Sequence, residues 1–316
     1  MNAMNFQFIH QLFDARVAEA PSQVFLSTPT ADFTLADLSA WVDRLVVELQ
    51  SDGVRAGDRV LIVAENCPEH VALILACSKV GAWSCGVNAR MSRGEVSLFV
   101  QKADPRVMYF TSEVSTAARA HAQEAAARGS VLTGLQRSAV RTHAVAEEGE
   151  LAQRVAAIIF TSGTTGTPKG VLVSHQGLLK FGRVSTESRQ LTQADRSYAY
   201  LPMTHIFGLG TVLMASLYAR AALVMRSAFD PADVFNALAE GGVTQLQGPP
   251  AMFTRLLAWL DTQGIEHPVC PDLRYVYTGA APLDLKLKRA VEHRFSKPLH
   301  HGYGLSEYAG ALCLGL

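Results

Sequence analysis

The chain has 316 residues, of which 49% are apolar and 18% are charged, a composition typical of soluble globular proteins. Lysine plus arginine equals aspartate plus glutamate at 28 each, so the formal net charge is zero and nothing favours a nucleic acid as partner. No apolar run approaches the roughly 18 residues that a membrane-spanning helix needs, so we expect no membrane span.

The cysteines and the N-terminus give the first structural expectations. The five cysteines are odd in number and no two form a C-x-x-C pair, which argues against a zinc site and a disulfide framework. We therefore expect small buried thiols in a reducing compartment, and with them a cytoplasmic location. The first 21 residues lack the apolar segment of a secretory signal; Ile9, Leu12, Phe13 and Val17 instead mark one face of a helix.

Short apolar runs alternate with helical patterns along the first half of the chain. The run RVLIVA at Arg59–Ala64 predicts a buried strand, and Pro68–Val80 predicts a helix with proline at its start. Ser92 and Glu95 have the spacing of a capping box and predict a helix that ends near Ala103. The other elements expected here are a strand over Val107–Phe110 and an alanine-rich helix over Val114–Arg128.

The pattern weakens between Gly129 and Gln153, and with the chain's length this predicts two α/β subdomains, residues 1–150 and 151–316. The alternation then resumes and indicates an α/β fold with largely parallel sheets flanked by helices. The strands expected in the second half are Val155–Phe160, Val171–Val173, Ser197–Tyr200, Ala221–Met225, Val243–Leu246 and Leu273–Thr278. One helix is expected to begin near His175. Three others are expected over Pro231–Glu240, Pro250–Leu260 and Leu283–Phe295.

The stretch Thr161–Gly170, TSGTTGTPKG, directly follows a predicted strand, where α/β folds bind ligands. Its three glycines let successive backbone N–H groups point at one anion, its hydroxyls add neutral donors, and Lys169 adds a positive charge. These parts suit a polyphosphate. The stretch is neither a G-x-G-x-x-G fingerprint nor a Walker A loop, because Pro168 precedes the lysine and Gly170 follows it where serine or threonine is needed.

TSGTTGTPKG resembles the phosphate-loop signature of the adenylate-forming, or AMP-binding, enzymes: acyl- and aryl-CoA synthetases, luciferases and adenylation domains of peptide synthetases. Four other segments resemble motifs of this family in the same order: SKVGAWSCGVNARMSRGEV (Ser78–Val96), LPMTHIFGL (Leu201–Leu209), TGAAPL (Thr278–Leu283) and HGYGLSE (His301–Glu307). The resemblance covers the chain from about Thr34 onward. It points to the acyl/aryl-CoA synthetase branch, similar to 4-coumarate–CoA ligase and luciferase.

The resemblance implies a binding site for ATP or AMP. The phosphate loop would hold the β- and γ-phosphates, Ser306 would donate to the α-phosphate, Glu307 would bind Mg²⁺ and Tyr303 would stack on adenine. The nucleotide-binding residues that the resemblance implies are Thr161, Ser162, Gly163, Thr164, Thr165, Gly166, Lys169, Gly279, Ala280, Ala281, Pro282, His301, Gly302, Tyr303, Gly304 and Ser306. When the resemblance is set aside, a helix cap explains Ser306 equally well, and a structural turn before Pro282 explains residues 279–281 equally well.

The resemblance also implies a catalytic group and an acid pocket. His205 matches the family's histidine near the α-phosphate and the acyl carboxylate, and together with Lys169 and Glu307 it forms the implied catalytic set. The implied acid pocket consists of His205, Phe207, Thr211 and Gly279. Packing within a core helix explains Phe207 and Thr211 equally well.

The activity implied is an AMP-forming ligase that joins an aromatic or fatty carboxylic acid to AMP and then transfers the acyl group to CoA. Family members continue well beyond the motif at His301–Glu307. The chain would therefore be an incomplete large N-terminal domain, without the small C-terminal domain and its adenylation lysine. Two alternatives stay open: an adenylation protein that loads a carrier-protein thiol, and a catalytically impaired nucleotide-binding fragment. A homodimer is compatible with each of them.

Overall fold

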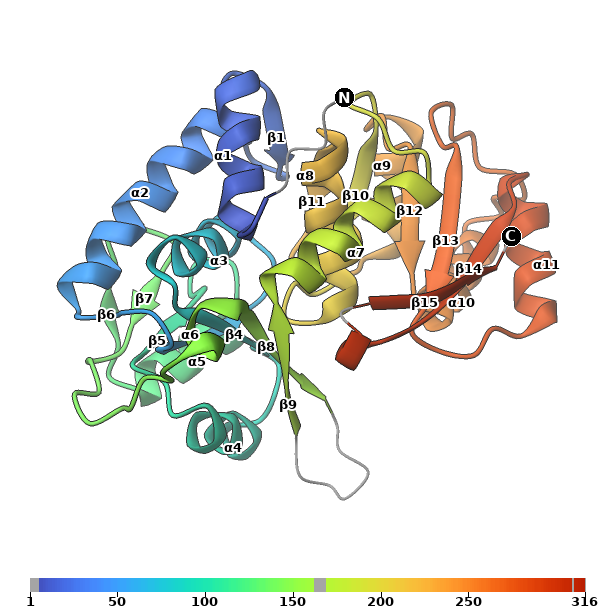
Figure 1. The fold of residues 1–316 in the computed structure, drawn as a ribbon. Coiled ribbons are helices and arrows are strands. Elements are labelled where there is room, and N and C mark those ends of the chain that lie inside the picture. Colours follow the sequence, from blue (N-terminus) through green and yellow to red (C-terminus); the bar gives the residue numbers. More distant parts are fainter. Residues whose placement is uncertain (1–5, 162–168, 309, 316) are drawn as a thin grey trace.

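The computed structural model describes residues 6–161, 169–308 and 310–315, whose strands form two sheets (Figure 1). In order across the sheet, the seven-stranded sheet contains β6 (Arg128–Gly129), β7 (Gln136–Arg137), β5 (Val107–Phe110), β3 (Arg59–Ala64), β4 (Trp83–Asn88), β8 (Val155–Thr161) and β9 (Lys169–Ser174). The eight-stranded sheet contains β15 (Gly310–Gly315), β14 (Leu299–Leu305), β13 (Tyr275–Gly279), β12 (Gln245–Gly248), β10 (Arg196–Ala199), β11 (Ala222–Met225), β1 (Val24–Ser27) and β2 (Asp32–Thr34).

Both sheets are parallel in their interior. Neighbouring strands run parallel from β5 through β3 and β4 to β8, and from β14 through β13, β12, β10 and β11 to β1. Antiparallel pairs stand at the ends of the sheets, as in β8–β9 and β14–β15. The expected largely parallel α/β fold is therefore confirmed, and the carboxyl ends of the interior strands lie at one edge of each sheet.

Helices cover the sheets and fill the space between them. The helices of the first half are α1 (Ile9–Glu19), α2 (Leu35–Ser51), α3 (Pro68–Val80), α4 (Arg93–Ala103), α5 (Thr116–Glu124) and α6 (Glu150–Arg154). Those of the second half are α7 (His175–Ser188), the π-helix η1 (Phe207–Met214), α8 (Ala215–Ala219), α9 (Pro231–Ala239), α10 (Pro250–Thr262), α11 (Leu285–Phe295) and the 3₁₀ turn η2 (Ser306–Tyr308). None of the described helices is long and apolar enough to cross a membrane.

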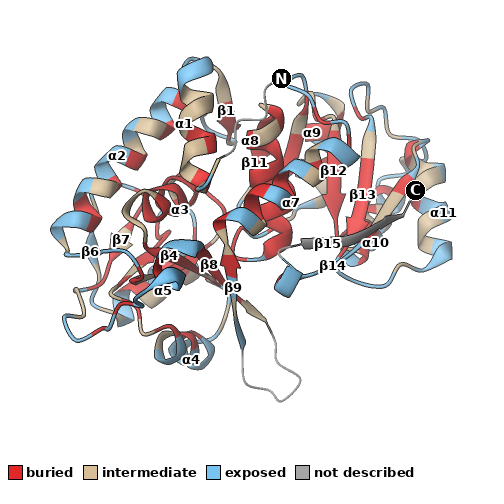
Figure 2. Cartoon of the chain, viewed as in Figure 1, coloured by how far each residue is buried: buried red, intermediate tan, exposed pale blue. Residues whose placement is uncertain are grey.

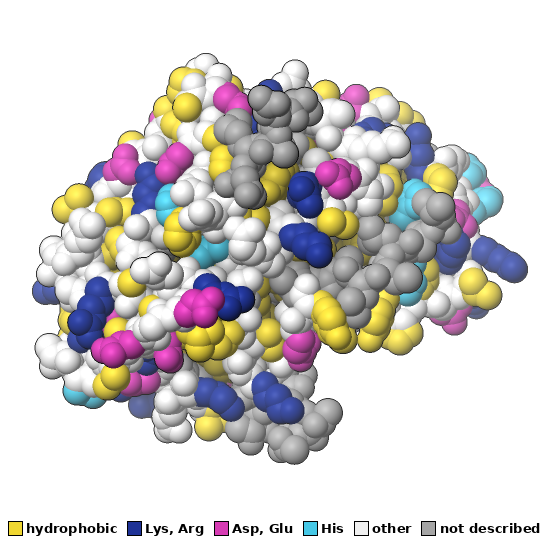
Figure 3. Space-filling view, in the orientation of Figure 1, with side chains coloured by type: hydrophobic (Ala, Val, Ile, Leu, Met, Phe, Trp, Pro, Cys, Tyr) yellow, Lys and Arg dark blue, Asp and Glu magenta, His cyan; other side chains and the backbone are white. Residues whose placement is uncertain are grey.

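One apolar core joins the two sheets. Buried side chains concentrate in the central strands and in the helices between them, including α3 and α8 (Figure 2). The largest cluster contains Val60 and Ile62 of β3 together with Leu223 of β11, so it extends from one sheet to the other. On the face shown in Figure 3, acidic and basic side chains are interspersed.

Three elements of the first half have the predicted bounds, Arg59–Ala64, Pro68–Val80 and Val107–Phe110. The capping box before α4 is also confirmed: Ser92 Oγ accepts from the Glu95 N–H at 3.4 Å, and the Glu95 carboxylate accepts from the Ser92 N–H at 2.7 Å. The helix predicted over Val114–Arg128 is shorter at both ends. Ser115 caps α5, and Ala126 adopts a φ of 47°, which ends the helical geometry.

Each strand and helix predicted in the second half occurs, in the predicted order and with bounds shifted by up to two residues; η1, α8, β14 and β15 were not predicted. The strand predicted at Val243–Leu246 lies at Gln245–Gly248, and the helix predicted from Leu283 begins at Leu285 because Asp284 caps it. The segment 129–153 contributes β7, which pairs with β5, and the short helix α6. Both sheets cross the predicted division after residue 150, since β1 and β2 belong to one sheet and β8 and β9 to the other. The division stays a prediction.

Candidate active site

The glycine- and threonine-rich stretch closes a β-hairpin. Thr161 at the end of β8 pairs with Lys169 at the start of β9, and Lys169 is exposed. The predicted phosphate-loop residues Ser162, Gly163, Thr164, Thr165 and Gly166 lie outside the described residues. A strand rather than a helix follows the loop, which agrees with the absence of Walker A spacing.

The other two nucleotide motifs lie on adjacent parallel strands. Thr278 pairs with His301 and Gly279 pairs with Gly302, where β13 ends and β14 continues to Leu305. A Cβ on Gly279 would stand 3.1 Å from the Gly302 carbonyl oxygen, so the close approach of these strands favours glycine. Ala280 follows with a φ of 66°, a conformation that costs a non-glycine residue about 1 kcal/mol. The two motifs therefore form a single backbone surface at the sheet edge.

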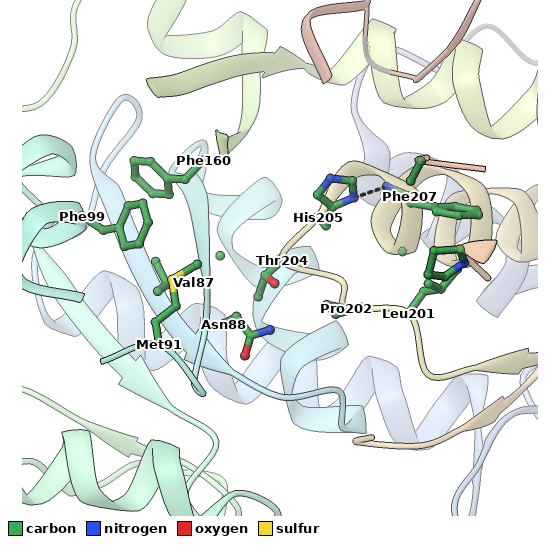
Figure 4. Close-up of a pocket in the computed structure, with 14 residues that line it drawn as sticks. Val87, Asn88, Met91, Phe99, Phe160, Leu201, Pro202, Thr204, His205 and Phe207 are labelled. Atoms are coloured by element: carbon green, nitrogen blue, oxygen red, sulfur yellow. Dashed lines mark hydrogen bonds between the residues drawn. The ribbon is translucent and has the colours of Figure 1, made fainter. Parts of the chain in front are cut away.

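His205 stands beside this edge, in the segment between β10 and η1. Its Nδ1 accepts the backbone N–H of Phe207 at 3.2 Å, so the neutral ring carries its proton on Nε2 (Figure 4). The side chain is exposed at the mouth of a cavity, yet the protein atoms around it lower the pKa of His205 by desolvation. The imidazole is therefore neutral near pH 7 and can donate from Nε2.

A buried amide fixes the segment that leads to His205. Asn66, in the turn after β3, donates from Nδ2 to the Leu201 carbonyl at 2.8 Å and accepts the Met203 N–H on Oδ1 at 3.0 Å. Its side chain is 4% exposed. This amide connects the carboxyl end of the seven-stranded sheet to the segment that follows β10.

A cavity of about 290 Å³ lies between the two sheets at His205. Val87, Met91, Phe99 and Phe160 gather on one side of it, and the segment from Thr204 to Phe207 lies on the other (Figure 4). The remaining lining residues are Gly86, Asn88, Leu201, Pro202, Gly208, Pro249 and Ala280. The walls are mainly apolar, as is usual for sites that bind small organic molecules.

A second, smaller cavity of about 50 Å³ adjoins the first at His205, Phe207 and Ala280. All four residues of the predicted acid pocket line it, together with three residues of the predicted nucleotide site. The predicted residues that line it are His205, Phe207, Thr211, Gly279, Ala280, Gly302 and Gly304. The structure therefore brings segments that lie about 100 residues apart in the chain to one place.

Comparison with known proteins identifies the family. The family model described as AMP-binding enzyme matches residues 13–316. The chain belongs to the AMP-binding enzyme family. It is 28% identical to the indoleacetate–CoA ligase of Aromatoleum aromaticum over 95% of this chain and 60% of that protein. The chain thus spans about three fifths of the length of this relative.

Solved structures of this family share the fold. ATP-bound MatB from Rhodopseudomonas palustris superposes with a TM-score of 0.77 at 25% identity, over 95% of this chain and 61% of that one. The N-terminal domain of FACL13 from Mycobacterium tuberculosis gives a TM-score of 0.78 at 24% identity, over 96% and 77% of the two chains. The expected fold, a large N-terminal domain of an adenylate-forming enzyme, is confirmed.

Other predicted residues of the AMP-binding motifs lie outside both cavities. Tyr303 is 58% exposed, Glu307 is exposed, and Ser306 is buried at the start of η2. His301 places Nε2 3.3 Å from the Ala281 carbonyl oxygen, and Ala281 and Pro282 continue the turn after β13. Because η2 packs against β9, Glu307 belongs to the same surface as the hairpin that carries Lys169.

The sequence did not single out several residues that shape the cavities or fix the segments around them. The rings of Phe99 and Phe160 pack at a tilt of 50° with a centroid distance of 4.5 Å, and Gly86 approaches the Thr204 backbone. Asn66 and Arg189 were missed as well. Gly86 lies within the segment that resembles a family motif, but the other four carry no local signal, since only the folded chain brings them to the site.

Proposed function

We propose that the chain is the nucleotide- and acid-binding part of an AMP-forming carboxylate–CoA ligase. The observation that carries the proposal is the convergence of three predicted motifs around the two cavities. Gly279 pairs with Gly302, both line the smaller cavity, and His205 lines both cavities. ATP-bound MatB shares the fold and indoleacetate–CoA ligase shares the sequence pattern, and both support ATP and CoA as substrates.

The proposed reaction has two steps. A carboxylate oxygen of the acid forms a bond to the α-phosphorus of ATP and pyrophosphate leaves, giving an acyl-adenylate. The thiol of CoA then attacks the acyl carbonyl, a thioester forms and AMP leaves. The first step brings two anions together, so its catalysis consists mainly of neutralising charge and aligning the reacting atoms.

The nucleotide would occupy the surface between the hairpin and the ends of β13 and β14. Lys169, Thr161 and the loop residues would hold the β- and γ-phosphates, Ser306 the α-phosphate, and Tyr303 with residues 279–282 and 301–304 the adenosine. The described residues contain no cluster of three metal-ligating side chains. A single carboxylate such as Glu307 fits Mg²⁺, which takes most of its ligands from phosphate oxygens and water and neutralises their charge.

The acid would place its carboxylate at His205, whose Nε2–H can donate to a carboxylate oxygen. The apolar side chains of Phe207 in the smaller cavity and of Phe99 and Phe160 in the larger one favour an aromatic or fatty acid. A neutral His205 donates this hydrogen bond without taking up a proton in the first step. A cytoplasmic location and a homodimer remain parts of this proposal.

Binding tests the proposal directly on this chain. Calorimetric titration with ATP and with a benzoyl-sulfamoyl-adenosine, a stable analogue of an acyl-adenylate, should detect binding of both, with the analogue tighter because it fills the acid and nucleotide sites together. Absence of binding by both ligands contradicts the proposal. Turnover of a panel of acids with CoA or a carrier protein as acceptor distinguishes the two ligase hypotheses, and binding without turnover favours an impaired fragment.

A further inference from the structure

A buried arginine without a carboxylate partner lies behind the smaller cavity. Arg189, the capping residue that directly follows α7, is 3% exposed. Among residues 6–161, 169–308 and 310–315, no aspartate or glutamate forms an ion pair with it. Burial lowers the pKa of Arg189, but a guanidinium stays charged at neutral pH. A positive charge therefore lies inside the protein with only dipoles around it, which is costly without compensation.

Two of the three residues that contact the Arg189 side chain also line the smaller cavity. Its Nη1 donates to the Thr211 carbonyl at 3.1 Å and to Gln247 Oε1 at 2.6 Å. Its guanidinium carbon lies 4.4 Å from the centre of the Tyr277 ring, a cation–π contact. Thr211 and Tyr277 both line the smaller cavity. The cation is thus separated from the cavity by the thickness of one ring.

Several polar atoms of this cluster have no hydrogen-bond partner. Arg189 Nε, Gln247 Nε2 and both side-chain polar atoms of Gln245 are buried and unpartnered among the described residues. Gln245 and Gln247 alternate along β12 and so point to the same face, and Gln247 pairs with Tyr277 of β13. An apolar cavity backed by unsatisfied donors and an unpaired cation has a positive potential at its wall.

Tyr277 connects the cation to the cavity. Burial raises the pKa of the Tyr277 phenol although Arg189 lowers it, so the hydroxyl keeps its proton at neutral pH. Arg189 has only donors and cannot accept that proton. The side-chain hydrogen bond between Arg189 and Tyr277 therefore runs from the guanidinium to the hydroxyl oxygen, and the hydroxyl proton stays free for another acceptor. A hydroxyl that accepts from a cation is a stronger donor in turn.

We propose that Arg189 and Tyr277 select carboxylic acids that carry a second oxygen acceptor, such as a hydroxyl, keto or carboxylate group, at the end remote from the reacting carboxylate. The selection acts within the acid site and so rests on the proposed function. A remote acceptor would take the Tyr277 hydrogen bond in the field of Arg189. An acid ending in a methyl group would leave that donor buried and unpaired, which lowers affinity.

Matched ligands measure this selection independently of turnover. We would titrate the chain with two pairs of acyl-sulfamoyl-adenosines: 4-hydroxybenzoyl against 4-methylbenzoyl, and 5-oxohexanoyl against hexanoyl. Hydroxyl and methyl groups are nearly equal in size, so the first pair differs mainly in hydrogen bonding. The acceptor-bearing ligand should bind about tenfold more tightly in one pair or both, as expected for a hydrogen bond to a polarised donor.

Variants assign the preference to the two residues. Tyr277→Phe and Arg189→Met should each bring the affinity ratio within a pair close to one, and Arg189→Lys should reduce it in part because the charge remains. Tyr275→Phe is the matched control: Tyr275 lies on the same face of β13 but stacks on His300 at 4.4 Å and lines neither cavity, so the ratio should persist. Should Arg189→Met not fold, Tyr277→Phe and Arg189→Lys carry the test.

The outcomes separate this inference from the proposed function. Equal affinities within both pairs, or a preference that survives Tyr277→Phe, overturn the inference and leave Arg189 as a group that holds the carbonyl of η1. Failure of all four ligands and ATP to bind contradicts the proposed function, and the inference falls with it.

Discussion

Gly86 allows β4 and the segment before His205 to meet backbone to backbone. A Cβ at this position would stand 2.8 Å from the Thr204 Cα, too close for any side chain. Gly86→Ala should therefore displace the segment that carries His205, lower stability by about 1–3 kcal/mol and weaken binding of an acyl-adenylate analogue. Thermal unfolding and calorimetry measure the two effects.

Gly94→Ala is the matched control for this change. A Cβ on Gly94 meets no atom within 4 Å, and the residue lies in the exposed first turn of α4. Alanine there should stabilise the helix by up to about 1 kcal/mol and leave ligand binding unchanged. Equal affinities of wild type and Gly86→Ala would show that this contact does not position the site.

His70 makes stability depend on pH. The side chain is 1% exposed, neither ring nitrogen has a described partner, and burial lowers the pKa of His70 from 6.5 to about 4. Below about pH 6.5 the unfolded chain binds a proton on His70, whereas the folded chain does not bind it until about pH 4. The free energy of unfolding therefore falls as the pH falls from about 6.5 to about 4. The contribution is roughly 2 kcal/mol between pH 7 and pH 5, from 1.36 kcal/mol per pKa unit.

Denaturant titrations at pH 7 and pH 5 check this linkage. His70→Leu has no proton to bind, so its loss of stability over this interval should be smaller than that of wild type by roughly 2 kcal/mol. His143→Gln, at an exposed position, serves as control for the removal of a histidine. An equal loss in wild type and His70→Leu would mean that the buried ring takes up its proton in the folded state.

At the scale of elements, the segment between β10 and η1 depends on a single amide from the other sheet. Asn66→Ala would leave the Leu201 carbonyl and the Met203 N–H without their buried partner, at a cost of about 1–3 kcal/mol. We expect faster amide hydrogen exchange at residues 201–207, while β3 keeps its protection. Unchanged exchange in this segment would contradict a positioning role for Asn66.

The sequence predicted elements well where both ends carry local signals. α3 has the predicted bounds because Pro68 suits the first helical position and Gly81 ends the helix at a φ of 75°. The π-helical form of η1 was not predicted: all eight of its residues are buried, so the segment has no amphipathic period, and its Thr211 carbonyl accepts from the distant Arg189. Motif residues marked the paired strands β13 and β14, but the wall formed by Phe99 and Phe160 depends on how α4 and β8 come together in the folded chain.

At the scale of the whole molecule, the two sheets are interleaved along the chain. β1 and β2 belong to the eight-stranded sheet, the chain then forms all seven strands of the other sheet, and it returns to the first sheet after β9. Neither half can complete its sheet alone, and one apolar cluster extends between them. The cavities lie at this junction, so the geometry of the site depends on both sheets being folded together.

This interleaving predicts that the chain unfolds in one cooperative transition. Trp83 lies on β4 of the seven-stranded sheet and Trp259 on α10, which packs beside the eight-stranded sheet, so single-tryptophan variants report each part. One variant would combine Trp41→Phe with Trp259→Phe, and the other Trp41→Phe with Trp83→Phe. Within each variant, the fluorescence and far-UV circular dichroism midpoints in urea should coincide.

The two midpoints are compared within one variant because Trp83→Phe removes a hydrogen bond to the Ala152 carbonyl and so shifts the unfolding midpoint of the variant that carries it. Midpoints that differ within either variant would instead indicate two units that unfold separately, as a division near residue 150 requires.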